Sequence, residues 1–210
     1  MVSKEILQPN FDLYRYMGKW YEIFKFPTLF QSKCARSTAE YIQVQDETLK
    51  METKSLRIAE PKITIFTLVE CFDNNDKLVY HYKGEVRVVN PEYPAALEVG
   101  FHVSADPLRF TGTPNYLIHE TDYDNYAIVG SLDRRSLFVL ARKQSIDLEL
   151  FKMLIDRVRI LGYSTNNLIL DNGAIIGMQL PQSSNLSADN WTTLYFLVLI
   201  IIIVLIFTNR

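Results

Sequence analysis

Residues 15–22 have the sequence Arg-Tyr-Met-Gly-Lys-Trp-Tyr-Glu (RYMGKWYE), and they open a series of short β-type runs that continues to about residue 143. Turn signals separate these runs, as at residues 73–76 (DNND). Between residues 96 and 103, apolar side chains alternate with small or polar ones, which is the pattern of a strand with one buried face, and further strands are expected over residues 116–121, 126–132 and 136–142. About eight or nine such strands, at spacings near ten residues, predict an antiparallel sandwich or barrel.

One amphipathic helix is predicted after the strands, over about residues 146–161. Apolar residues recur every three or four positions from Phe151 to Leu161, and the resulting stripe needs a hydrophobic surface to lie on. The outside of a barrel can supply that surface. Ser145 is the expected N-cap, and Gly162 is the expected stop. Residues 168–170 are expected to add a final short strand.

Charge and motif content exclude several classes of function. The 210 residues include 22 Lys and Arg and 24 Asp and Glu, so no basic face for nucleic acid is expected. The three histidines, His81, His102 and His119, lie on separate predicted strands, and no metal site is predicted. The sequence shows no phosphate loop, dinucleotide fingerprint, Gly-x-Ser-x-Gly motif or recognisable pair of carboxylates. We therefore predict no cofactor and no catalytic residue.

The C-terminal part is strongly apolar. Residues 194–207 (LYFLVLIIIIVLIF) extend to an uncharged segment over 191–208. As a helix with a rise of about 1.5 Å per residue, this segment would span roughly 27 Å, which predicts a transmembrane helix. A buried core helix or strand is the alternative. Residues 171–190, rich in Ser, Asn and Gln, are the predicted linker.

The N-terminal tail, residues 1–8, shows no secretory signal, so we expect a single-pass, tail-anchored membrane protein with its body on the cytosolic face. Arg210 and the glycosylation sequons at Asn185 and Asn190 leave the lumenal orientation open. In the cytosol Cys34 and Cys71 would be reduced, whereas in the lumen they could pair.

Three stretches of the chain resemble the signature regions of the lipocalins. They are Asn10-Phe-Asp12 with residues 15–22, residues 120–129 (ETDYDNYAIV) and residues 138–143 (FVLARK). The opening is most similar to the branch of apolipoprotein D and the bacterial outer-membrane lipocalins. The resemblance covers about residues 9–170. It implies a mainly β fold, an eight-stranded antiparallel up-and-down barrel with one C-terminal amphipathic α-helix.

The resemblance also implies roles for residues at the closed end of the barrel. Gly18 would let the chain turn into the first strand, and Trp20 would point into the closed end. Arg142 would lay its guanidinium over the indole as a cation–π contact. These three residues are expected to be structural, and to form the barrel floor.

Strand alternation nominates the lining of a ligand site inside such a barrel, although each residue could also be plain core filling. The predicted ligand-binding residues are Phe24, Leu49, Met51, Leu97, Val99, Phe101, Tyr116, Ile118, Tyr126 and Ile128. The stretch between Leu56 and Lys77 is longer than the family's usual connection, which predicts an extra hairpin or a long lid over residues 57–76.

The predicted function is a membrane-anchored lipocalin-like protein that binds or carries a lipid or other small hydrophobic ligand in its barrel. Its partners would be that ligand and the membrane, through residues 191–208, and no protein partner is predicted. Two rivals stay open. One is an interaction or scaffold protein with a packed barrel, and the other is an enzyme that acts on an apolar substrate inside the barrel.

Overall fold

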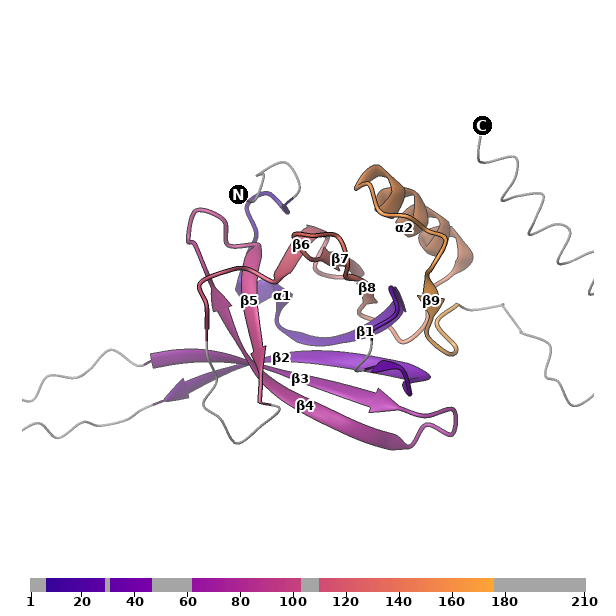
Figure 1. Cartoon of the computed structure of the whole chain (residues 1–210), viewed down its shortest axis with the longest axis horizontal. Coiled ribbons are helices and arrows are strands. Elements are labelled where there is room, and N and C mark those ends of the chain that lie inside the picture. The colour runs from indigo at the N-terminus through magenta and orange to yellow at the C-terminus, as the bar shows by residue number, and fades with distance from the viewer. Residues whose placement is uncertain (1–6, 29–30, 47–61, 103–109, 176–210) are drawn as a thin grey trace, which may run out of the picture. The chain divides into compact units, whose positions relative to one another are not determined.

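The computed structural model describes residues 7–28, 31–46, 62–102 and 110–175. These residues belong to the first of two units, residues 1–177 and 178–210. Strands dominate the described part of the chain (Figure 1). In chain order the elements are α1 Leu13–Tyr16, β1 Gly18–Lys25, β2 Arg36–Asp46, β3 Lys62–Phe72, β4 Leu78–Val88, β5 Ala96–Phe101, β6 Tyr116–Thr121, β7 Tyr126–Gly130, β8 Leu137–Ala141, α2 Leu148–Ile160 and β9 Ile169–Leu170.

The sheet closes on itself through β1. Strands β2 to β8 pair in chain order, each antiparallel to the next. Strand β1 pairs with β8 along one edge, and its first half pairs with β2 along the other. The short strand β9 adds two pairs at the end of β1. The predicted eight-stranded up-and-down barrel is therefore confirmed.

Several predicted boundaries are close to the observed ones. The run at 116–121 coincides with β6, and the expected final strand at 168–170 is β9. The prediction of an extra hairpin or lid over residues 57–76 was wrong for residues 62–76. These residues form β3 and the turn that leads into β4. Strand β3 pairs with β2 without a break from Asp46↔Lys62 to Arg36↔Phe72, so the additional length extends a strand.

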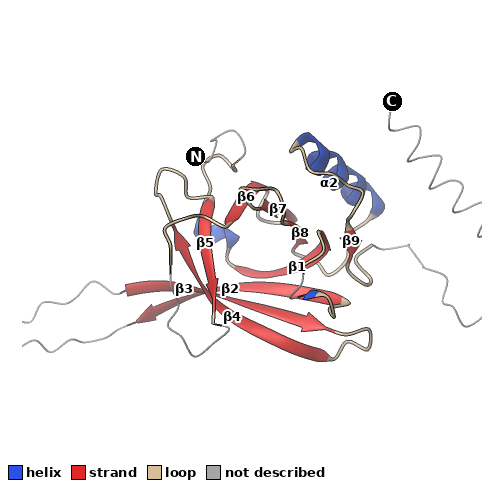
Figure 2. Cartoon of the chain, in the orientation of Figure 1, coloured by secondary structure: helices blue, strands red, loops and turns tan. Residues whose placement is uncertain are grey.

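Helix α2 lies on the outer face of the barrel (Figure 2). Its buried residues Leu154 and Val158 pack with Ile23 of β1 and Val139 of β8. The expected N-cap, Ser145, was wrong. The cap is Asp147, whose carboxylate accepts a hydrogen bond from the Leu150 N–H at 2.8 Å.

The helix ends where the sequence predicts. Gly162 has a φ of +81°, a left-handed conformation that glycine adopts without steric cost. The N–H of Tyr163 then donates to the Val158 carbonyl at 3.1 Å, which satisfies one of the last free acceptors of α2. Gly162 is thus confirmed as the stop of the helix.

The predicted localisation, a single-pass membrane protein with a cytosolic barrel, is contradicted. Within the part of the chain that the structure describes, no helix combines the length and apolar character needed to cross a bilayer. Helix α2, the longer of the two described helices, has 13 residues. Its rise of about 20 Å is short of a hydrocarbon core of about 30 Å. The segment 191–208 lies outside the described residues, and we withdraw the membrane localisation.

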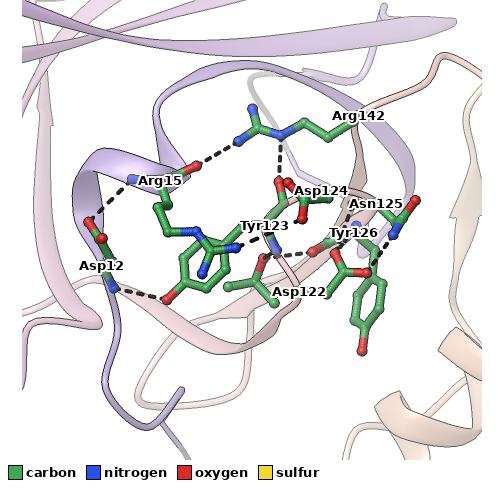
Figure 3. Close-up of polar contacts among 9 residues, drawn as sticks. Asp12, Arg15, Asp122, Tyr123, Asp124, Asn125, Tyr126 and Arg142 are labelled. Carbon is green, nitrogen blue, oxygen red and sulfur yellow. Dashed lines mark hydrogen bonds and ion pairs between the residues drawn. The ribbon is translucent and has the colours of Figure 1, made fainter.

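Arg142, just after β8, joins three segments at the closed end of the barrel. Its guanidinium carbon lies 3.6 Å from the centre of the Trp20 ring, and Trp20 is fully buried. Nε donates to the Tyr123 carbonyl at 2.8 Å, and the two terminal nitrogens donate to the carbonyls of Lys19 at 3.1 Å and Arg15 at 3.0 Å. Figure 3 shows the contacts with Tyr123 and Arg15. The predicted cation–π contact is therefore present.

The turn into β1 fits closely beneath this guanidinium. Gly18 has a φ of +89°, and a Cβ there would lie 3.5 Å from an Arg142 nitrogen. Trp20 Nε1 donates to the Tyr16 carbonyl at 2.8 Å, which fixes the indole against α1. Asp12 caps α1 through its carboxylate, and its N–H donates to the Tyr123 hydroxyl at 2.9 Å (Figure 3). Backbone and side-chain contacts together therefore seal this end.

The substitution Arg142→Lys tests the seal. It keeps a positive charge near Trp20, but an ammonium cannot replace a planar guanidinium that serves three carbonyls. We expect the free energy of unfolding in urea to fall by about 2–4 kcal/mol. Arg135→Lys is the matched control, because the Arg135 side chain is 87% exposed, and it should change stability by less than about 0.5 kcal/mol. Equal stability of the two variants would contradict the role assigned to Arg142.

Candidate functional site

The barrel contains a cavity of about 230 Å³. At about 30 Å³ per non-hydrogen atom, it holds about eight such atoms, enough for a small molecule or one end of a longer one. Its lining comes from β1, β2, β3, β5, β6, β7 and β8, and from three of the connections between strands. The lining residues are Glu22, Gln31, Ala39, Tyr41, Thr67, Val69, Val99, Phe101, Asn115, Tyr116, Gly130, Ser136, Phe138 and Leu140.

Three of the predicted ligand-binding residues, Val99, Phe101 and Tyr116, are in this lining. Leu49 and Met51 lie outside the described residues. Leu97 and Ile118 are fully buried in the core cluster that contains Trp20 and are not among the residues that line the cavity.

Phe24, Tyr126 and Ile128 lie on the helix side of the barrel wall, and we correct their assignment to the cavity. A bulge in β1 between Glu22 and Phe24 breaks the alternation, so Glu22 lines the cavity while Phe24 contacts Phe151 of α2, with ring centres 5.6 Å apart. Ile128 pairs with Val139, and both pack in the cluster under α2.

The sequence reasoning missed most of the remaining lining. Ala39 and Tyr41 of β2 pair with Val69 and Thr67 of β3, so the two strands present alternate residues to the cavity. That alternation is visible in the sequence and could have identified them. The polar lining residues Glu22, Gln31, Asn115 and Ser136 carry no such signal, because a search for apolar faces passes over them.

Three tyrosines form a cluster at the cavity: Tyr16 and Tyr41 are buried, Tyr116 is partly buried, and Tyr41 and Tyr116 line the cavity. The Tyr16 and Tyr116 hydroxyls are 2.9 Å apart and share a hydrogen bond. The ring centre of Tyr41 lies 5.2 Å from that of Tyr16 and 6.1 Å from that of Tyr116. Burial raises the pKa of all three phenols, so they stay protonated near neutral pH. The cluster therefore offers hydrogen-bonding groups without charge.

A second polar group links β1, β2 and β9. Lys25 is buried and donates to the Glu22 carboxylate and to Ser37 Oγ at 3.2 Å, and its Nζ lies 3.5 Å from Asp171 Oδ1. Gln31 donates to the other Glu22 oxygen at 2.7 Å. Lys25 therefore has three polar partners, Glu22, Ser37 and Asp171, and it is the counter-ion for the carboxylates of this cluster.

Asp171 is the residue of this cluster whose ionised form is disfavoured. Burial raises its pKa, the nearby Glu22 carboxylate raises it further, and the value reaches about 7 in spite of Lys25. Its Oδ2 accepts a hydrogen bond from the Ser37 N–H at 2.7 Å, which attaches the segment after α2 to β2. Backbone bonds from Asp171 to Ile23 and from Asn172 to Ala35 hold the same segment, so the carboxyl adds a protonation-sensitive contact to a backbone attachment.

Cys34 and Cys71 form a disulfide in the structure, with their Cα atoms 5.2 Å apart. The sequence left the pairing open and allowed it only for a lumenal body, and the structure contains it. The bond attaches the segment before β2 to the end of β3, across a sequence separation of 37 residues. Structural disulfides persist in oxidising compartments, which also argues against the cytosolic face expected for the barrel.

The pKa of Asp171 predicts a specific pH dependence of stability. The folded state holds this proton up to about pH 7, whereas the unfolded chain loses it near pH 4, so the contribution to stability falls as pH rises from about 4 to 7. Asp171→Asn cannot ionise. Relative to the unsubstituted protein, its free energy of unfolding in urea should therefore increase from pH 4.5 to pH 7.5.

The control for this series is Asp156→Asn on α2, because the Asp156 side chain is 69% exposed. Its difference from the unsubstituted protein should be the same at every pH. A difference for Asp171→Asn that is flat over this range, or that decreases, would show that Asp171 is ionised at acidic pH in the folded protein.

Comparisons with known proteins give a consistent result. A family model described as a lipocalin-like domain matches residues 11–172. A protein of Acanthamoeba polyphaga mimivirus that is named as a lipocalin is 29% identical over 164 residues, which cover 78% of this chain and 86% of that protein. Apolipoprotein D of Macaca fascicularis is 33% identical over 126 residues, which cover 60% of this chain and 53% of that protein. This chain thus matches about half the length of that relative.

Solved structures show the same fold. Insecticyanin from the tobacco hornworm Manduca sexta has a TM-score of 0.52 and 17% sequence identity, and the match covers 78% of this chain and 81% of that one. At this identity the likeness concerns the fold alone.

Proposed function

The chain belongs to the lipocalin family, and we propose that it binds a small hydrophobic molecule inside its barrel. The observation that carries this proposal is the cavity of about 230 Å³ in a closed barrel. Val69, Val99 and Leu140 give it apolar walls on three different strands. Small-molecule sites in proteins are of this kind, concave and mostly apolar with a few polar groups.

The size of the cavity sets the scale of the affinity. Each CH₂ group moved out of water contributes about 0.8 kcal/mol, so about eight groups contribute about 6 kcal/mol. The loss of translational and rotational freedom on association opposes this gain, so apolar contact in the cavity sets an upper limit of about 10–100 μM on the affinity it can supply alone. A ligand that also bonds to the polar lining would bind more tightly.

The cavity also argues against the alternative hypothesis, a scaffold protein with a packed barrel. Protein interiors are packed as densely as organic crystals, and unfilled spaces of this size are few in a domain. A scaffold protein whose barrel served only as a support would gain stability by filling the cavity with larger side chains. We therefore retain ligand binding, without catalysis, as the proposed function.

A fluorescent reporter tests the proposal. N-phenyl-1-naphthylamine is an uncharged apolar probe about twice as large as the cavity, so we expect one of its two ring systems to enter the cavity. It should bind the full chain saturably in the micromolar range. Val99→Phe places a ring in the cavity and should weaken binding of the probe at least tenfold. The matched control is Val79→Phe on β4, at a residue that is 44% exposed, and it should bind like the unsubstituted protein.

Circular dichroism of both variants checks that the barrel is folded. Absence of saturable binding to the unsubstituted protein, or equal loss in both variants, would reject the cavity as the binding site.

A further inference from the structure

One hydroxyl in the cavity is poorly bonded. Thr67 of β3 is 1% exposed and lines the cavity, and its Oγ1 makes no hydrogen bond of normal geometry within the described residues, although it acts on the Tyr41 hydroxyl opposite it as a weak partner. Buried polar groups in folded proteins nearly always have a hydrogen-bond partner, so each exception calls for a physical explanation. One such explanation is a ligand that supplies the missing partner, because the Thr67 hydroxyl then recovers the hydrogen bond that it lost on folding.

Two phenols stand near this hydroxyl. Tyr41 is directly opposite Thr67 in the register of β2 and β3, and Tyr116 lines the same cavity. Burial raises the pKa of Tyr41, and the neighbouring hydroxyls of Tyr116 and Thr67 oppose that rise without reversing it. The three groups are therefore uncharged, and each can both donate and accept a hydrogen bond.

The cavity offers nothing that would balance a negative charge. No lysine, arginine or histidine is among the described residues that line it, and Glu22 is the charged residue among them. Lys25, which lies behind Glu22, is occupied by Glu22, Ser37 and Asp171. A ligand carboxylate or phosphate placed beside Thr67 would lose its hydration without gaining a counter-ion, at a high cost in free energy.

We infer that the ligand is an uncharged molecule with an apolar body and a hydroxyl or carbonyl group, and that this group hydrogen-bonds to Thr67 beside Tyr41 and Tyr116. The inference rests on the proposed function and specifies its ligand class. Alcohols and ketones should therefore bind in preference to ionised fatty acids of the same chain length.

The substitution Thr67→Val removes the hydroxyl and keeps the shape of the side chain. The empty protein should be as stable as the unsubstituted one or more stable, because a poorly bonded buried hydroxyl is lost. Affinity for an alcohol should fall. Thr67→Ser retains the hydroxyl and should retain the affinity. The matched control is Thr38→Val, since Thr38 is also fully buried but is outside the cavity lining and bonds to Glu70.

The experiment uses displacement of N-phenyl-1-naphthylamine from the full chain at pH 8. The competitors are 1-octanol, octanoate and 1-chlorooctane, which share one chain length and differ in the terminal group. We expect 1-octanol to bind at least tenfold more tightly than octanoate. In Thr67→Val, the affinity for 1-octanol should fall about tenfold, while those for 1-chlorooctane and for the probe change less than twofold.

The outcomes separate the inference from the proposed function. Binding of the probe with unchanged 1-octanol affinity in Thr67→Val, or octanoate binding as tightly as 1-octanol, would overturn the inference and leave the proposed function standing. Failure of the probe to bind the unsubstituted protein would overturn both. An equal loss of 1-octanol affinity in Thr38→Val and Thr67→Val would show a general effect on the barrel and would also overturn the inference.

Discussion

The pairing of β1 with both β8 and β2 is the constraint on which the rest of the structure depends. It removes the free edges of the sheet and encloses an interior that a flat sheet of the same strands would leave open to water. Arg142 holds the start of β1 in place. It donates hydrogen bonds to the carbonyl of Arg15, before the strand, and to the carbonyl of Lys19, within it, and it stacks on Trp20.

The interior is chemically divided. Apolar side chains from β3, β5 and β8 form most of the wall, and two polar groups interrupt it. One is the uncharged set of tyrosines with Thr67, and the other is the ionic cluster of Glu22, Lys25 and Asp171. The ionic cluster satisfies its own charges and fastens β9 to the barrel. The uncharged set is left with a poorly bonded hydroxyl, and for this reason we assign the polar contact of a ligand to it.

The sequence was informative where local pattern decides the structure. The motif at residues 15–22 and Arg142 identified the closed end, and strand alternation placed β6 and β9. Alternation failed on β7, because α2 covers its outer side, so apolar residues occupy both faces and parity carries no information. It failed in β1 because a bulge after Glu22 changes which side chains point into the barrel and which point outward.

The ionic cluster could not be predicted for a different reason, and the sequence left open whether Cys34 and Cys71 pair. Asp171 meets Lys25 and Ser37 only after the chain has gone around the barrel, and nothing in the local sequence indicates that contact. The pairing of Cys34 with Cys71 follows from the register of β2 and β3, which places Cys71 opposite Ser37. The membrane localisation depended on residues 191–208, outside the described part of the chain, while the cytosolic barrel also disagrees with the disulfide.

A space that no side chain fills, inside a closed barrel, is the feature on which ligand binding depends. A crystal structure of the protein under xenon pressure measures it most directly, because xenon enters apolar cavities and scatters strongly. We predict xenon density enclosed by Val69, Val99 and Leu140. Side chains that fill this volume, with no xenon bound there, would contradict the presence of a binding cavity in this barrel.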